Sequence, residues 1–161
     1  LLRQDLTFTA TDSSFTTYLD KIAGRNVMDV RGGNIGIEIR MGLNYTEGVV
    51  KRGMSLEHFA ATTSTNAAKL LGMYPQKGAI SVGSDADIAI IDPSVKKALS
   101  MSDLHLRDYS PWEGWEVEGW PTTVMLRGNM MVDNGQLVGS PDVGKLIHRK
   151  ITPSVLQRPA F

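Results

Sequence analysis

Cysteine is absent from the 161-residue sequence. This absence excludes disulfide bonds and thiolate metal sites, and it is typical of a protein from a reducing compartment, so we expect a cytoplasmic location. No run of eighteen apolar residues occurs, so no membrane-spanning helix is expected. The first residues, LLRQDLTFTATD, have no basic region, long apolar core or cleavage site, and so do not resemble a secretory signal.

An excess of either charge is also missing. The chain has 17 basic and 17 acidic residues and a formal net charge of zero, so neither nucleic acid nor an anionic membrane is an expected partner. Hydrophobic residues make up 42% and charged residues 21%, which is typical of a globular protein. The length fits one domain or pieces of two. The sequence has no initiator Met and begins with a strand-like pattern, so we expect it to come from within a larger protein.

Histidine is scarce, and this bears directly on metal binding. The three histidines, His58, His105 and His148, are isolated, and no H-x-H pair exists. We assign no metal to any of them and expect them to pack, cap or lie at the surface. Residues 63–65, Thr-Ser-Thr, have no histidine partner, which argues against a hydroxyl nucleophile. No Walker A loop and no G-x-G-x-x-G motif is found.

The first half of the sequence predicts one strand followed by helices. Residues 6–11 favour a strand that ends at Asp12, whose neighbours Ser13 and Ser14 favour a turn. Loop and short helix are expected over residues 15–33, and a helix over residues 35–50.

Two further helices have recognisable ends. Ser55 can cap a helix whose apolar face includes Phe59. Thr65 can cap a second short helix over residues 66–71, which Gly72 would end as the residue after the C-cap.

From Gly78 onward the period changes to that of strands. We expect short strands at residues 80–82, at residues 88–91 with a stop at Asp92-Pro93, and at residues 122–126. Residues 130–132 and 136–138 flank Asn134-Gly135, the strongest short signal for a hairpin.

Little regular signal is present over residues 94–121, which hold all three tryptophans, Trp112, Trp115 and Trp120. We expect a packed loop there, in which the tryptophans serve a core or a subunit contact more readily than a sugar or base platform. The tail after Gly139 should be extended. Helices and strands segregate along the chain, so a boundary near Lys77 is expected.

Four segments, in one order, resemble the dihydropyrimidinase/hydantoinase family of amidohydrolases. The segments are TATDSSF at 9–15, GGNIGIEIRM at 32–41, STNAAKLLGMYPQKGAISVGSDADIAIIDP at 64–93 and DLHLRDYSPWEGWEVEGWPTTVMLRGNMMVDNGQLVG at 103–139. The third is shared by many amidohydrolases, and the second and fourth narrow the resemblance to cyclic amidases.

The resemblance implies an α/β fold in which a (β/α)8 barrel is followed by a β-sandwich. A barrel needs about 250 residues, so this chain would supply only its C-terminal part. Residues 1–77 would be the last barrel strand with its helices, residues 78–139 part of the sandwich, and residues 140–161 an extended tail.

For the active site, the resemblance singles out Asp12 and Asn34. Asp12 stands at the C-terminal end of its predicted strand, where barrel enzymes gather their catalytic groups. By resemblance it is both a metal ligand and the catalytic residue that shuttles a proton to the leaving nitrogen, whereas from the residues alone it can equally cap a turn. Asn34, in a glycine-rich bend, would bind substrate through its backbone, with an ordinary loop as the alternative. Ser13 and Ser14 stand where many relatives have His and Cys, which affects the expected shape of the substrate pocket.

The residues that complete such a site are not found in this sequence. The family uses four histidines and a carboxylated lysine to hold two divalent metal ions, and neither Lys69 nor Lys77 lies on a suitable element, so both are expected to be solvated or capping charges. The resemblance implies zinc ions that activate a hydroxide, a small cyclic amide as substrate, an N-carbamoyl amino acid as product, and a homo-oligomer, a tetramer, completed by the missing N-terminal part. Glu38 and Arg40 match the family's E-x-R pattern, for which a structural ion pair is the expected role. The alternative function is a non-catalytic scaffold or a truncated assembly piece.

Overall fold

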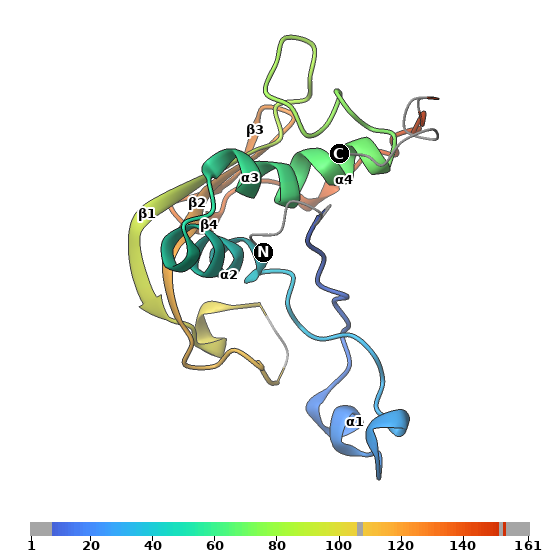
Figure 1. Cartoon of the computed structure of the whole chain (residues 1–161), viewed down its shortest axis with the longest axis vertical. Helices are drawn as coiled ribbons and strands as arrows, with labels where there is room; N and C mark the ends of the chain where they lie inside the picture. The colour runs from blue at the N-terminus through green and yellow to red at the C-terminus, as the bar shows by residue number, and fades with distance from the viewer. Residues whose placement is uncertain (1–7, 106–107, 152, 154–161) are drawn as a thin grey trace.

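The computed structural model describes residues 8–105, 108–151 and 153, and its centre is an antiparallel sheet. Four strands lie in the order β1-β2-β3-β4 (Figure 1). Their bounds are Ile88–Ala98, Glu116–Leu126, Asn129–Asp133 and Gln136–Leu137. The antiparallel sheet expected within residues 78–139 is therefore confirmed.

Two tight hairpins set the register of the last three strands. Asn134 and Gly135 both have positive φ, 47° and 78°, as the expected two-residue turn requires, so this prediction is confirmed. Arg127 and Gly128, with φ of 48° and 79°, connect β2 to β3 in the same way. The Arg-Gly turn was not predicted, because Arg has no particular preference for positive φ.

The two long strands extend further than the sequence indicates. β1 does not stop at Asp92-Pro93, since it continues to Ala98 across a register shift between Asp92 and Lys96. Proline is tolerated there because β1 is the first strand of the sheet order and its ladder is already interrupted. β2 begins at Glu116 and pairs with the far end of β1, so both ends of the expected loop over residues 94–121 are strand.

The strand expected at residues 80–82 is wrong. Residues 78–84 form turns, and the side chains of Ile80 and Val82 are exposed. An alternating apolar pattern makes a strand only where another strand supplies hydrogen bonds and a face to cover, and no described strand lies beside this segment. A turn follows, in which the Ser84 N–H donates to the Ser81 carbonyl at 3.0 Å.

The helices join into two longer rods. α2 (Arg40–Asn44) continues into a π-helical segment, η2 (Tyr45–Val50). α3 (Leu56–Ala60), η3 (Ala61–Thr65) and α4 (Asn66–Leu70) run on without a break. The helix expected over residues 35–50 begins only at Arg40, and the two short helices expected after it are found as parts of one continuous rod.

Of the three predicted helix ends, two are correct. The Ser55 hydroxyl accepts from the His58 N–H and caps α3. Gly72, at φ 69°, ends α4 in a Schellman motif, in which its N–H donates to the Lys69 carbonyl and the Met73 N–H donates to the Ala68 carbonyl. The Thr65 cap is wrong, because Thr65 is itself helical and its hydroxyl donates to the Gly78 carbonyl at 2.8 Å.

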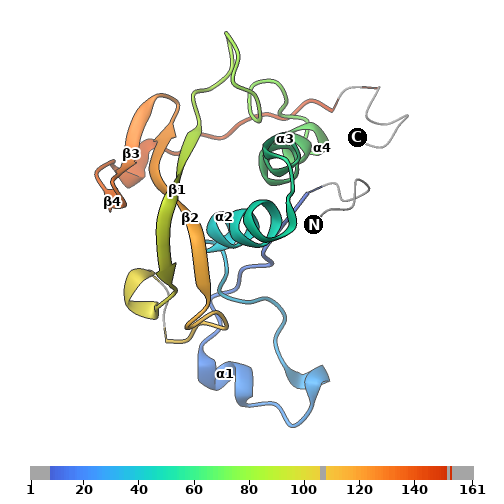
Figure 2. The same ribbon diagram turned by 60° about the vertical axis from the view of Figure 1, so that its left-hand side comes forward.

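The core lies where α2 and η2 pack on β2, beside the residue that follows β1 (Figure 2). Leu99 and Ile39 are each only 1% exposed and, with Val117, form its centre. Trp112 and Trp120 pack against this cluster, which favours the core role expected for tryptophan. The core therefore draws on both sides of the expected boundary at Lys77, and the division of the chain at that residue stays a prediction.

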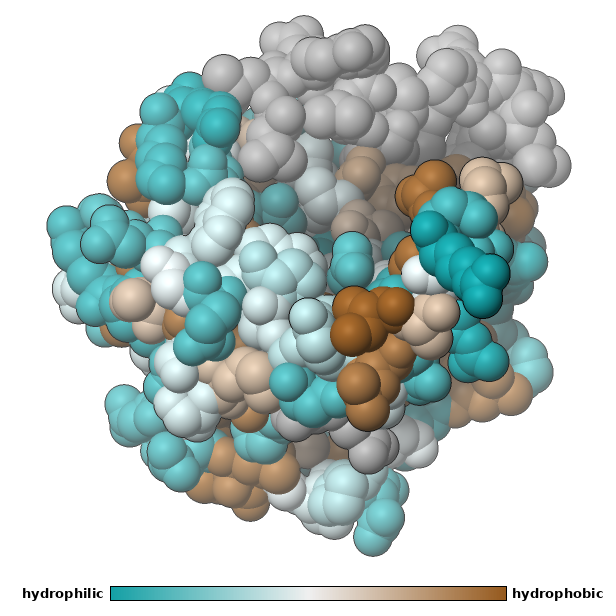
Figure 3. Space-filling model, turned by 90° about the horizontal axis from the view of Figure 1, so that it is seen from below, coloured by the Kyte–Doolittle hydropathy of each residue, from teal (hydrophilic) through white to brown (hydrophobic). Residues whose placement is uncertain are grey.

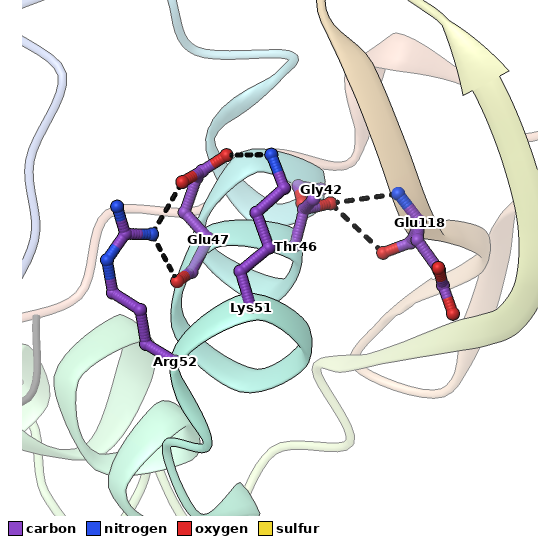
Figure 4. Close-up of polar contacts among 6 residues, drawn as sticks. All are labelled: Gly42, Thr46, Glu47, Lys51, Arg52 and Glu118. Atoms are coloured by element: carbon purple, nitrogen blue, oxygen red, sulfur yellow. Dashed lines mark hydrogen bonds and ion pairs between the residues drawn. The ribbon is translucent and has the colours of Figure 1, made fainter.

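Glycine allows the helix and the strand to approach closely. A Cβ added to Gly42 would lie 2.5 Å from the Trp120 ring, and one added to Gly119 would lie 2.4 Å from the Tyr45 ring. The buried Thr46 hydroxyl lies 2.7 Å from the Gly42 carbonyl and 3.0 Å from both the N–H and the carbonyl of Glu118 (Figure 4). These contacts satisfy polar groups of the helix and the strand inside the joint.

Residues 15–33 form an extension, here called the arm, that runs away from the sheet (Figure 1). It contains α1 (Tyr18–Ile22) and a short 3-10 helix, η1 (Val27–Asp29), neither of which buries a residue. Viewed from below, the molecule shows separate apolar patches among polar side chains (Figure 3). Loop and short helix were expected here, and both are found.

The strand expected over residues 6–11 is wrong for its described part. Residues 8–11 are extended but form no ladder, and one backbone hydrogen bond joins Thr9 to Thr62. A strand needs a hydrogen-bonded neighbour, and no described strand lies beside this segment. Residues 6 and 7 lie outside the described residues.

Two smaller elements complete the described chain, the 3-10 helices η4 (Met101–Asp103) and η5 (Pro141–Val143). Residues 144–151 have no regular element, as expected of the tail, and the Lys150 N–H donates to the Gly72 carbonyl. Among the described helices, none is both long and apolar enough to cross a membrane.

Candidate functional site

Asp12 and Asn34, far apart in the sequence, are in direct backbone contact. The Asn34 N–H donates to the Asp12 carbonyl and the Ser14 N–H donates to the Asn34 carbonyl, each at 3.0 Å. Together with the parallel bridge between Ser13 and Asn34, these two bonds form what we call the clip. The clip brings together the two residues that the sequence singles out for a site.

The clip depends on an unusual backbone at two positions. Asp12 has a φ of 47°, a left-handed conformation that Asp adopts more readily than most residues. Gly33 has a φ of 80°, and a Cβ there would lie 2.5 Å from the Asp12 carbonyl oxygen. Glycine at position 33 is therefore required for this approach of the two segments.

A lysine closes the arm behind the clip. The Lys21 ammonium donates to the carbonyl oxygens of Arg31 and Gly33, which gathers the end of the arm onto α1. At the other end of α1, the Tyr18 N–H donates to the Asp108 carboxylate. The arm is thus joined to the body through Tyr18 and Asp108, whereas Lys21 holds the end of the arm against its own helix.

The Asp12 carboxylate faces solvent. Its residue is exposed, and no hydrogen bond or ion pair to the carboxylate is found among the described residues. The expected position at the end of a strand is wrong, because residues 8–11 form none. A free carboxylate remains available to bind a cation or a proton.

The backbone N–H of Asn34 is engaged, whereas its carbonyl can still accept a hydrogen bond. Its N–H is engaged by Asp12, whereas its carbonyl accepts one bond from Ser14 and has a second lone pair. The residue is exposed. A ligand could therefore bind the Asn34 backbone as a donor to the carbonyl oxygen.

The described residues do not by themselves make a metal centre. No group of three or more His, Asp or Glu side chains close enough to hold a metal ion is found within residues 8–105, 108–151 and 153. A catalytic zinc usually takes about three protein ligands. Asp12 can supply one ligand, so the donor set of the described chain does not fit a complete site.

Arg40 ties the segment before Asp12 to two helices. Its guanidinium lies 3.1 Å from the Thr9 carbonyl and 3.5 Å from the Thr63 carbonyl. Asn44, one turn further along the same rod, donates to the Thr9 hydroxyl at 3.2 Å. Arg40, Asn44 and Thr9 line a cavity of about 410 Å³ between residues 8–11 and α2.

The expected ion pair between Glu38 and Arg40 is not found, because each binds another group. Glu38 accepts from the His105 N–H at 2.8 Å and lies 2.7 Å from the His105 ring Nδ1. Glu38 lies in the turn before α2 and Arg40 is the first residue of α2, and their side chains bind different partners. The sequence motif could indicate two anchoring residues but not their partners.

The other two histidines, like the first, belong to no group of possible metal ligands among the described residues. His58 is half-buried in α3, and its Nε2 is buried with no hydrogen-bond partner among the described residues. His148 is exposed in the tail. Hydrogen bonding of His105 agrees with the role expected for it.

Lys77 belongs to a polar network that the sequence analysis missed. Its ammonium forms ion pairs with Asp85, at 2.9 Å, and with Asp87. Burial lowers the pKa of Lys77, but hydrogen bonds to Asp87 and Asp85 outweigh it, and the pKa is raised above its usual value. The expected solvated charge is therefore wrong for Lys77, and the repeated Asp of the GSDAD sequence was the available signal. Lys69 lies over the Tyr74 ring, with 5.4 Å to its centroid.

Comparison with known proteins identifies a matching family and similar proteins from two bacteria. The model of the amidohydrolase family matches residues 4–131. A D-hydantoinase of Ralstonia pickettii is 42% identical over 132 residues, which is 81% of this chain and 29% of that protein. A D-hydantoinase of Geobacillus stearothermophilus is 43% identical over 119 residues, covering 73% of this chain and 25% of that protein.

Solved structures similar to this chain are also hydantoinases and dihydropyrimidinases. A crystal structure of a D-hydantoinase has a TM-score of 0.83 at 37% identity and covers 89% of this chain and 32% of that one. A dihydropyrimidinase from Brevibacillus agri has a TM-score of 0.78 at 42% identity, over 84% of this chain and 30% of that one. The chain thus spans less than a third of the length of the relatives it matches.

Proposed function

Because the chain belongs to the amidohydrolase family, we propose that the whole protein is a metal-dependent cyclic amidase. It hydrolyses the ring amide of hydantoins or dihydropyrimidines to N-carbamoyl amino acids. The observation that carries the proposal is the similarity to D-hydantoinases, at about 40% identity over most of this chain. The match of structures of the same kind supports it.

The fold of the family is α/β, and its finer division belongs to the proposal. We assign residues 1–77 to the end of a (β/α)8 barrel, residues 78–139 to a β-sandwich and residues 140–161 to a tail. In such a barrel, the clip would lie at the face where active sites of this fold are built.

Asp12 is the proposed catalytic residue. Its solvent-facing carboxylate accepts the proton of the attacking water and returns it to the departing ring nitrogen, so that one group acts as base and then as acid. The lack of a competing hydrogen bond among the described residues supports this role. The left-handed backbone of Asp12 and its bond from Asn34 hold the carboxylate at the edge of the clip.

Asn34 is the proposed substrate-binding residue. Since its N–H is taken by Asp12, the free lone pair of its carbonyl is left to accept a hydrogen bond from a ring N–H. A cyclic amide offers such a donor beside the carbonyl that is attacked. The distance between Asp12 and the substrate is then governed by the same clip that holds Asn34.

The metal ions would be held mainly by residues outside the described chain. Members of this family are generally metal-dependent, and we propose two divalent ions, zinc, with Asp12 as one ligand. Such ions would lower the pKa of a bound water toward neutrality. A homo-tetramer in the cytoplasm completes the proposal.

The test is an assay of the whole protein on hydantoin and on dihydrouracil, with zinc or manganese added. We expect turnover by the whole protein and none by residues 1–161 alone. Asp12→Ala should lower kcat by roughly a hundred- to ten-thousand-fold, the usual worth of general acid–base help, with metal loss adding to it. Asp133→Ala, at an exposed aspartate of the hairpin, is the matched control and should leave kcat unchanged.

Three outcomes would contradict different parts of the proposed function. Near-normal turnover by the Asp12→Ala protein would show that the role of this residue is wrong. Turnover by residues 1–161 alone would reject the ligand assignment. A whole protein that is folded, metal-loaded and inactive on both rings would favour the scaffold alternative, which the comparisons do not favour.

A further inference from the structure

Thr9, three positions before Asp12, is bound by groups from both helical rods. Its N–H donates to the Thr62 carbonyl of η3 at 2.9 Å, and its hydroxyl accepts from the Asn44 side chain of α2 at 3.2 Å. Its carbonyl accepts from Arg40 at 3.1 Å. These hydrogen bonds anchor Thr9 to both helical rods, three residues before Asp12.

Arg40 makes the connection between the rods at this point. One guanidinium nitrogen lies within hydrogen-bond distance of the Thr9 carbonyl, the Thr9 hydroxyl and the Thr63 carbonyl, at 3.1, 3.4 and 3.5 Å. The arginine is half-buried, and the hydrogen bonds of its side chain to described residues all go to uncharged oxygens. A rigid, planar cation of this kind fixes several acceptors at once, which a flexible ammonium does less well.

The segment held in this way has little other support. Residues 8–11 join no described ladder, Phe8 is exposed, and the hydrogen bonds of Asp12 to other described residues are those of the clip. The position of the Asp12 carboxylate is therefore set from two sides, by Arg40 through Thr9 and by Asn34 through the clip.

We propose that Arg40 is a positioning residue for Asp12, an inference that rests on the proposed function. Arg40 holds the Thr9 carbonyl against α2 and η3, and this fixes the course of residues 9–12 and with it the direction of the Asp12 carboxylate. Arg40 does not touch substrate and takes no part in proton transfer. Its loss changes the geometry of the reaction while leaving the sheet and its core intact.

The test compares three variants of the whole protein: Arg40→Met, Arg40→Lys and Arg52→Met. Arg40→Met should lower kcat by roughly ten- to a hundred-fold, the scale expected of a small misplacement of a catalytic group, with KM little changed. Arg40→Lys keeps a charge and a donor and should fall between this variant and the unmodified protein. Arg52, an exposed arginine paired with Glu47, is the matched control and should change neither constant.

Amide hydrogen exchange separates positioning from a general loss of stability. In the Arg40→Met protein, the amides of Thr9 and Asn34 should exchange faster, because their bonds to Thr62 and Asp12 are weakened. The amide of Leu99, bonded to the Trp115 carbonyl in the core, should keep its protection. Arg52→Met should leave all three amides unchanged.

Two results would overturn the proposal. If Leu99 loses protection to the same degree as Thr9 and Asn34, Arg40 serves global stability alone. If exchange and kcat both stay as in the unmodified protein, Arg40 positions nothing. If the whole protein hydrolyses no cyclic amide, the proposed function fails, while the exchange measurement still decides whether Arg40 fixes residues 9–12.

Discussion

The sheet with α2 and the arm of residues 15–33 are built by different means. In the sheet region, Leu99 and Ile39 are closed off from solvent by aromatic rings, and the backbone is paired along strand ladders. In the arm, neither α1 nor η1 buries a residue, and single polar contacts fix its ends. Apolar burial stabilises the sheet region, whereas local backbone geometry shapes the arm.

The difference matters because the candidate site lies where the second kind of structure begins. Asp12 and Asn34 are exposed, and the clip between them consists of two backbone hydrogen bonds. Functional residues are commonly carried on such segments and held in place by a packed scaffold. We therefore expect substitutions in the sheet region to change stability and substitutions at the clip to change geometry.

The largest contrast should come from Leu99→Ala set beside Met28→Ala. Leu99 is 1% exposed in the core, and its truncation should lower the free energy of unfolding by about 2–5 kcal/mol. Met28 is 87% exposed on the arm, and its truncation should change the free energy of unfolding by less than about 0.5 kcal/mol. Urea unfolding of both variants measures the difference. Equal losses would mean that the arm is packed against something in the whole protein.

Gly33→Ala should have a smaller effect, confined to the clip. A left-handed φ destabilises a residue with a side chain by roughly 1–2 kcal/mol, and here the added methyl would also meet the Asp12 carbonyl. We expect faster exchange of the Asn34 amide and lower turnover by the whole protein. Gly53→Ala is the control, since Gly53 has a φ of 68° but open space around it. If both variants behave alike, backbone strain alone and not the close approach explains the glycine.

The smallest effect should come from Glu47→Gln on the exposed side of the η2 rod. Hydrogen bonds from Lys51 and then Arg52 lower the pKa of Glu47 (Figure 4). A carboxylate whose pKa is lowered in the folded state stabilises the fold at pH values above its ordinary pKa of 4.5. This contribution is lost as the pH falls through the pKa of the folded state. Exposed pairs contribute about 0–1 kcal/mol. Unfolding midpoints should therefore differ slightly at pH 7 and coincide at low pH, and a difference that persists at low pH would contradict this origin.

The sequence was a good guide wherever a local rule decides the structure. Asn134-Gly135, the Ser55 cap and the Gly72 helix end each depend on the φ preference or hydrogen-bonding capacity of one or two residues. The resemblance of 9–15 and 32–41 to family segments singled out Asp12 and Asn34, which lie in backbone contact, and their roles stay predictions.

The errors arise where distant partners decide. Residues 8–11 and 80–82 have strand-like patterns, yet no described strand lies beside them. Pro93 was taken as a stop, but pairing with β2 carries β1 past it. Arg40 was assigned to Glu38, whereas its acceptors are the carbonyls of Thr9 and Thr63, which no sequence spacing indicates.

The two glycine–aromatic contacts between α2, η2 and β2 have a consequence for sequence variation. Gly42 makes room for Trp120, and Gly119 makes room for Tyr45, so each glycine is fixed by the size of a ring on the opposite element. A larger residue at position 42 can be accommodated only with a smaller one at position 120, whereas Gly119 also has a φ of 85°, which disfavours a side chain whatever residue stands at position 45. Because such neighbours interact non-additively, these positions should change in pairs or not at all. Recombination between relatives that separates α2 from β2 would therefore disrupt a match that neither half of the chain encodes alone.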